Sequence, residues 1–186
     1  KSMAEMARPP IRTQLDAKLA PVALARVVVD IPRGTRIGGR SPCLDYTPPV
    51  FWDSGRTAVK PDEFSERYFH ALKVANYIVV GDPTILFATT AEKVAPRYRV
   101  GARINRIAMN LCDHMGRKSG EGAIRVVWQV QDVIDERIAY ETTTEGGAQI
   151  APGDAKVEAS FTLLIDAFEN PARKLAADQG CYRLDA

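Results

Sequence analysis

Residue types that carry catalysis or bind metals are scarce in this sequence. Only two histidines occur among its 186 residues, and the chain has no HxxxH, no HExxH and no calcium-type loop of alternating acids. The glycines of residues 31–40 (IPRGTRIGGR) match neither GxxxxGK[ST] nor GxGxxG, the common phosphate-binding patterns. We therefore expect no catalytic residue, no metal site, no cofactor and no enzymatic activity.

Long apolar runs are also missing. The longest, such as residues 77–80 and 163–165, fall far short of the roughly 20 residues that a membrane-spanning helix needs. The sequence therefore predicts no transmembrane segment, and it leaves peripheral association with a membrane open.

Neither sign of charge is in large excess. The chain has 25 basic and 23 acidic residues, for a net charge of +2, so a nucleic-acid partner would require a local basic patch. The densest basic group has three of its four members on one side of a predicted strand, where a solvated polar face is the favoured interpretation. Its members are Arg97, Arg99, Arg103 and Arg106. We expect no nucleic-acid partner.

Cysteine is rare. Cys43, Cys112 and Cys181 form no CxxC pair and no cluster with metal-ligand spacing. One disulfide with one free thiol, or three unlinked thiols, both fit the sequence, because spacing alone does not fix connectivity.

The rival enzymatic interpretation uses Cys112, Asp113 and His114. These residues are adjacent in the chain, however, and adjacent side chains diverge instead of forming a relay. The other histidine, His70, falls within a predicted helix and is expected on its surface or at the edge of the core.

The first half of the globular part alternates strand and helix signals. Residues 25–31 (ARVVVDI) are rich in β-branched side chains and stop at Pro32, as a strand would. Residues 33–60 contain many glycines and prolines and predict a long loop. Pro61 then opens an amphipathic helix that ends at Asn76. A short buried strand at residues 77–80 and a second helix at residues 84–94 follow.

The second half predicts an antiparallel meander and a closing helix. Polar and apolar side chains alternate through residues 97–145, with a slip near residues 105–107 that indicates a β-bulge. Residues 113–121 predict a polar hairpin loop, and Gly146-Gly147 is expected to end the last strand. Phe161, Leu164 and Phe168 then recur at helical spacing, and Pro171 should kink or restart that helix.

These elements predict one α+β domain over residues 23–186, preceded by an extended arm over residues 1–22. The expected architecture is a two-layer sandwich, in which two main helices pack on one face of a mixed sheet of about five strands.

Two long segments carry a resemblance to known families. Residues 62–83 (DEFSERYFHALKVANYIVVGDP) followed by the meander resemble the amino-terminal domain of TolB, CsgG and the auxiliary lipoproteins of lipid-transport ABC systems. VVWQVQD and YETTTEG are also similar to the region preceding trypsin-like domains in some alphaproteobacterial envelope proteins, although no Gly-Asp-Ser-Gly segment is present. The resemblance implies a bacterial envelope domain without a shared catalytic set.

We accordingly expect a non-catalytic component, periplasmic or associated with the outer membrane, of a multi-protein envelope complex. Its expected partners are other envelope proteins, further copies of itself included. The alternatives are a non-catalytic accessory domain of a trypsin-like protease polypeptide, or a module that binds peptidoglycan or a small ligand.

Apolar points on the arm and on the long loop are the candidate interaction residues. They are Ile11, Leu15, Leu19, Tyr46, Phe51 and Trp52. The arm has no periodic apolar face, so we expect it to become ordered on a partner. For Phe51 and Trp52 the alternative is that they pin the loop to the core.

Overall fold

The computed structural model describes residues 21–40, 49–52, 61–82, 87, 95–114, 117–151 and 159–178. The predicted arm up to residue 20, most of the long loop and, apart from Phe87, the predicted helix at residues 84–94 fall outside these ranges. Val22, the last residue of the predicted arm, already lies in the first strand.

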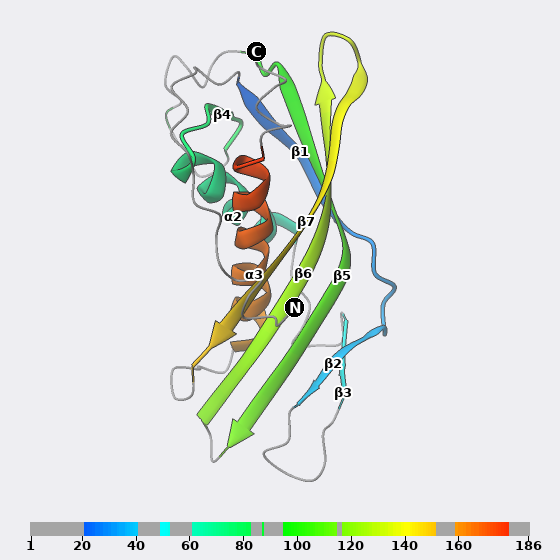
Figure 1. Cartoon of the computed structure of the whole chain (residues 1–186), viewed down its shortest axis with the longest axis vertical. Coiled ribbons are helices and arrows are strands. Elements are labelled where there is room, and N and C mark those ends of the chain that lie inside the picture. The colour runs from blue at the N-terminus through cyan, green and yellow to red at the C-terminus, as the bar shows by residue number, and fades with distance from the viewer. Residues whose placement is uncertain are drawn as a thin grey trace.

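The described elements form two layers (Figure 1). Two helices, α2 (Pro61–Val74) and α3 (Ala159–Ala176), pack against each other and lie on the same face of one mixed sheet. The α+β sandwich with both main helices on one face is therefore confirmed. Among the described residues the sheet has seven strands, two more than expected. They are β1 (Val22–Val29), β2 (Arg36–Arg40), β3 (Pro49–Phe51), β4 (Val79–Val80), β5 (Tyr98–His114), β6 (Arg117–Asp132) and β7 (Arg137–Ile150).

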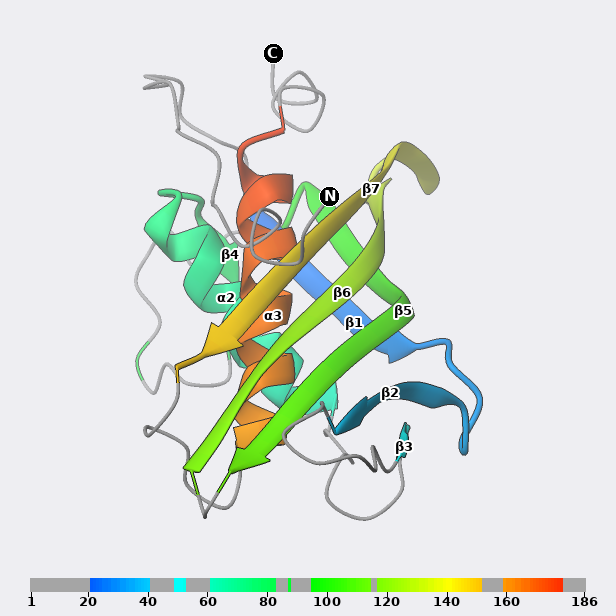
Figure 2. The same cartoon turned by 60° about the horizontal axis from the view of Figure 1, so that its bottom comes forward.

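Strand β5 organises the sheet. On one side it pairs along its length with β6, which pairs in turn with β7, so the three form the predicted antiparallel meander (Figure 2). On its other side, β1 runs parallel to its first half and β2 parallel to its second half. The short strands β4 and β3 extend the sheet beyond β1 and β2. The predicted bulge is confirmed, because the β5–β6 register shifts between Ile104 and Arg106.

The β5–β6 hairpin and strand β7 extend further at one end of the meander than the sequence indicated. Strand pairing runs to His114 and resumes at Arg117, so the predicted loop over residues 113–121 was too long. Gly120 and Gly122 lie on the helix-facing side of β6. Apolar side chains at these positions would have continued the alternating pattern that predicts a strand, and glycine interrupts it. A β-carbon at Gly122 would lie 3.1 Å from Cγ of Leu163, so this position is kept small by the approach of α3.

Strand β2 was not predicted, because its glycines read as a loop. A β-carbon at Gly38 would lie 1.6 Å from the carbonyl oxygen of Met109 in the paired strand β5. Glycine here permits the close approach of two backbones.

Helix α2 begins and ends as predicted. Pro61 stands at its first position, and Asp62 and Glu63 face the positive end of the helix dipole. Asn76, at a φ of 60°, adopts the left-handed conformation that commonly follows a helix.

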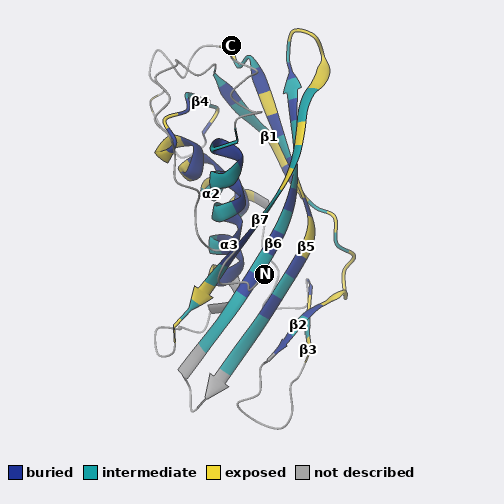
Figure 3. Ribbon diagram, viewed as in Figure 1, coloured by how far each residue is buried: buried dark blue, intermediate teal, exposed yellow. Residues whose placement is uncertain are grey.

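The core lies between the helices and the inner face of the sheet (Figure 3). Its centre is an aromatic cluster in which Trp128 of β6 packs against Tyr68 of α2 and Phe168 of α3, with ring centroids 5.8 Å apart in both pairs. Phe64 lies 4.9 Å from Phe168 and joins the two helices. Because these four side chains are almost fully buried, they fix both helices on one face and leave the other face of the sheet without a described helix.

Candidate functional site

The sheet face opposite the helices, here called the open face, is the candidate interaction surface. The strand registers place its side chains in cross-strand rows. One row runs Arg26, Gly101, Gln129, Glu141, and the next runs Val28, Arg103, Val127, Thr143. Flanking rows contain Arg99, Gln131 and Ile138 on one side, and Arg106, Arg125 and Glu145 on the other. Residues in these rows alternate with the buried residues of the core, because successive side chains of a strand point to opposite faces.

Charge is unevenly distributed across the open face. In these four rows the five arginines lie on β1, β5 and β6, and the two glutamates lie on β7. Arg125 forms an ion pair with Glu145, and Gln129 Nε2 donates to Glu141 Oε2 over 2.7 Å. Both acids are thus engaged by β6. Arg26, Arg99, Arg103 and Arg106 form no ion pair within the described part of the chain, and all four are exposed.

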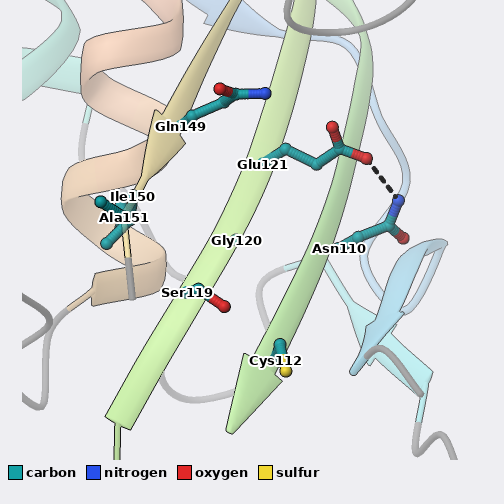
Figure 4. A pocket seen from close by; sticks show the side chains of 8 residues that line it. All are labelled: Asn110, Cys112, Ser119, Gly120, Glu121, Gln149, Ile150 and Ala151. Atoms are coloured by element: carbon teal, nitrogen blue, oxygen red, sulfur yellow. Dashed lines mark hydrogen bonds between the residues drawn. The ribbon is translucent and has the colours of Figure 1, made fainter. Parts of the chain in front are cut away.

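A shallow hollow lies on the same side, at the far end of the meander (Figure 4). Its volume is about 700 Å³, and Asn110, Glu121 and Gln149 cross its floor from three neighbouring strands. Asn110 Nδ2 donates to Glu121 Oε1 over 3.3 Å. The lining offers amide, carboxylate and hydroxyl groups, which suits hydrogen bonding.

Cys112 borders this hollow and is disulfide-bonded. Its sulfur is therefore not a free thiolate, which is the form a cysteine nucleophile requires. The side chains of Asp113 and His114 lie outside the described set. Within the described residues, no group of three or more His, Cys, Asp or Glu side chains could hold a metal ion.

A second group of titratable residues joins the outer surfaces of the two helices. Glu169 of α3 receives Arg173 Nη2 at 2.5 Å and Arg67 Nη1 at 3.4 Å, and its Oε1 lies 3.0 Å from His70 Nδ1. Burial raises the pKa of Glu169, but the hydrogen bond and charge of Arg173, with His70, outweigh it, so this pKa lies below its usual value. In Asp166 burial prevails over Arg67, and the pKa is raised. This network ties α2 to α3, so we assign it a structural role.

The β6–β7 turn contains another buried carboxylate. Asp132 accepts the backbone amides of Ile134 at 2.9 Å and Asp135 at 3.2 Å, and pairs with Arg97 at 2.6 Å. Burial raises the pKa of Asp132, but these amides and Arg97 outweigh it and hold that pKa below its usual value. The pair orders the turn, and it removes Arg97 from the arginine group of the open face.

The outer edge of the sheet is partly closed by α3. Lys174 donates to the carbonyl oxygen of Glu145, and Asn170 Nδ2 donates to that of Gly147 over 2.6 Å. These side chains engage backbone acceptors that would otherwise be open to strand addition on β7. The open face therefore remains the broader candidate surface.

Two of the six predicted interaction residues, Phe51 and Trp52, lie among the described residues. Ile11, Leu15, Leu19 and Tyr46 lie outside the described residues. Phe51 is 37% exposed at the end of β3, whereas Trp52 is 6% exposed and belongs to the core. Trp52 therefore fits the alternative interpretation, in which it pins the loop to the core, and Phe51 is the exposed member of the pair.

Sequence reasoning identified part of the basic surface. By period-2 spacing, the three arginines expected on one side of a strand are Arg97, Arg99 and Arg103. Arg99 and Arg103 do share the open face, whereas Arg97 pairs with Asp132. Arg106 joins them because the β-bulge shifts the register before it. Arg26 and Arg125 were missed, because only strand pairing brings β1 and β6 beside β5.

No family model matches the chain, and no curated protein matches it. Several solved structures do. A Xanthomonas campestris protein of family DUF330 is 12% identical over 96% of this chain and 91% of its own, with a TM-score of 0.44. A minor lipoprotein from Acinetobacter baumannii is 9% identical over 88% and 94%, with a TM-score of 0.43. The PelC dodecamer from Paraburkholderia phytofirmans is 12% identical over 91% and 96%, with a TM-score of 0.44.

Similarity at this level transfers no function to the chain. The matched structures include a bacterial lipoprotein, and the narrower resemblance to TolB and CsgG stays a prediction. Within the described residues, no helix has both the length and the apolar character needed to cross a membrane.

Proposed function

We propose that this chain is a non-catalytic component of the bacterial cell envelope, on the periplasmic side, that docks through the open face of its sheet. The observation that carries this proposal is the asymmetry of the two faces. The helices fill one face with a closed aromatic core, and the other presents five arginines and exposed aliphatic side chains. A sheet face of this kind suits a broad contact with another macromolecule.

The disulfide of Cys112 supports the proposed location in the periplasm. Disulfides persist in oxidising environments such as the bacterial periplasm and are rare in the cytosol. The same bond argues against the rival enzyme built on Cys112, because a disulfide sulfur is not the free thiolate such a mechanism uses.

The partners in this proposal are other envelope proteins, further copies of this chain and the membrane surface. Two exposed positions test the protein contacts: Thr143 on the open face and Glu66 on the outer surface of α2. Thr143→Trp places a bulky ring in the proposed contact, and Glu66→Trp places the same ring away from it.

The experiment is native mass spectrometry of the complex extracted in mild detergent from cells making each variant. We expect a complex heavier than the 20.4 kDa monomer for the unmodified chain and for Glu66→Trp, and loss of that complex for Thr143→Trp. A monomeric mass for the unmodified chain, or equal complexes from both variants, would overturn the proposal.

A further inference from the structure

Four arginines of the open face, Arg26, Arg99, Arg103 and Arg106, form what we call the arginine patch. They come from two neighbouring strands. Arg26 of β1 lies opposite Gly101, midway between Arg99 and Arg103 of β5. Gly101 has no side chain, and even a β-carbon there would have its nearest neighbour 4.0 Å away. The patch is therefore a two-dimensional array across the sheet.

The patch lacks its own counter-charges. Within the described residues none of the four arginines forms an ion pair, and neither does Asp30, the acid that follows β1. Arg106 lies directly opposite Arg125, and like charges in directly opposed positions destabilise a sheet. The ion pair with Glu145 neutralises only Arg125 and leaves the charge of Arg106 uncompensated within the described residues. Anions from outside the chain would reduce this repulsion between arginines.

Exposed aliphatic side chains lie within the same surface. Val28, opposite Arg103, is 39% exposed, and Ile138, in the row of Arg99, is 52% exposed. Basic residues interspersed with exposed aliphatic groups match the interface of an anionic bilayer, where phosphates meet the guanidinium groups and apolar side chains enter the headgroup region. Arginine suits this role because its planar guanidinium binds phosphate oxygens in pairs.

Other polyanions fit less well. Single-stranded nucleic acid is usually held by aromatic rings on which bases stack, and the described rows of the open face contain no aromatic residue. An extended acidic peptide fits a single line of charges better than an array over two strands.

We infer that the arginine patch docks the chain on an anionic phospholipid surface by binding lipid phosphates. This inference rests on the proposed function, since it names the membrane as the partner of one half of the open face. Docking would orient the hollow at Asn110 and Glu121, at the other end of β5 and β6, toward further partners.

The test is flotation of the full chain with vesicles at low salt. One set contains phosphatidylcholine alone, and the other contains phosphatidylcholine with phosphatidylglycerol. The variant is Arg99→Gln/Arg103→Gln. The matched control, Arg33→Gln/Arg137→Gln, removes the same charge from exposed arginines outside the patch. Arg99→Lys/Arg103→Lys keeps the charge, and circular dichroism confirms folding of every variant.

We expect binding to the anionic vesicles only, weakened by added salt. A basic residue near such a surface contributes about fivefold in affinity, so Arg99→Gln/Arg103→Gln should bind roughly thirtyfold more weakly. The control and the lysine variant should keep most of the binding. Equal binding to neutral vesicles, equal losses in patch and control variants, or binding to free DNA without binding to vesicles would overturn the inference. None of these results bears on the native mass of the complex, so failure here is distinct from failure of the proposed function.

Discussion

Gly146 of β7 lies against Pro171 of α3 so closely that a β-carbon at Gly146 would be 2.1 Å from Cδ of Pro171. Asn170 Cβ and the carbonyl oxygen of Ala167 would lie at 2.7 and 2.9 Å. Helix α3 continues through Pro171 without ending, so the ring is accommodated where the strand has no side chain. The glycine that seemed to end the last strand instead lets the helix pack on it.

Gly146→Ala should therefore push α3 away from the sheet. We expect a loss of about 1–3 kcal/mol in the free energy of unfolding, the usual cost of overpacking. Gly101→Ala is the matched control, because its added carbon meets its nearest neighbour at 4.0 Å. Urea denaturation of both variants measures the difference, and equal stabilities would show that α3 yields without cost.

The hydroxyl of Thr144 connects the core to α3. It accepts the indole N–H of Trp128 at 2.7 Å and donates to the carbonyl oxygen of Pro171 at 3.0 Å. Thr144→Val keeps the shape but leaves the buried indole N–H without this acceptor, so we expect a loss of about 1–3 kcal/mol. Thr143→Val, on the exposed face, should change stability by less than about 0.5 kcal/mol. Thermal unfolding compares the two, and a neutral Thr144→Val would contradict the role of this hydrogen bond.

Acid should weaken the contact between α2 and α3. The pKa of Glu169 is lower in the folded chain than its ordinary value of 4.5, so the stabilisation by its charge is fully present above that value. It is lost as the pH falls through the lower folded pKa. Asp166, with a raised pKa, acts in the opposite sense and offsets part of the effect.

Glu169→Gln should reduce stability at pH 7 by about 1–2 kcal/mol and flatten the dependence of stability on pH between about 5 and 3. Glu66→Gln is the control, because Glu66 is exposed and forms no ion pair within the described residues. The test measures the free energy of unfolding of both variants and of the unmodified chain across this pH range. If the stability of Glu169→Gln depended on pH as steeply as that of the unmodified chain, the charge of Glu169 would not be the cause of the acid sensitivity.

The fold was largely predictable because its strongest signals are local. Helix α2 has its capping residues and apolar spacing in one segment, and the alternation of β5 and its bulge appear in the sequence directly. The errors arose at Gly38, Gly122 and Gly146, where glycine permits close packing of elements distant in the chain. A single sequence does not distinguish that role from a turn.

The candidate site was harder to predict because it is assembled by strand pairing. Arg99 and Arg103 share a strand, and their common face follows from period-2 alternation. The neighbours that make a patch, Arg26 on β1 and Val28 beside Arg103, depend on which strand pairs with β5 and in what register. Trp52 was a candidate interaction residue but is buried. Its burial also could not be predicted from the sequence, because it depends on contacts with the assembled core.

The strand register gives an expectation for the disulfide partner of Cys112. Arg40, three residues before Cys43, pairs with Leu111. Asp178, three residues before Cys181, accepts a hydrogen bond from the hydroxyl of Tyr140. Tyr140 lies at the opposite end of the sheet, in the same cross-strand row as Val130 and Val100. Val100 and Cys112 are about 40 Å apart along the strand, whereas three residues span about 10 Å.

We therefore expect a Cys43–Cys112 disulfide and a free Cys181. Mass spectrometry of unreduced peptides tests this, with Cys181→Ser expected to retain the bond and Cys43→Ser expected to abolish it. A Cys112–Cys181 peptide would contradict the strand register.

The most direct test of the account as a whole is site-specific photo-crosslinking in intact cells. A photoreactive amino acid replaces either Thr143 on the open face or Glu66 on α2, both of which are exposed. The account predicts crosslinked adducts from position 143, to envelope proteins or to other copies of the chain, and few or none from position 66. Adducts from position 66 alone would contradict the claim that the open face is the working surface of this protein.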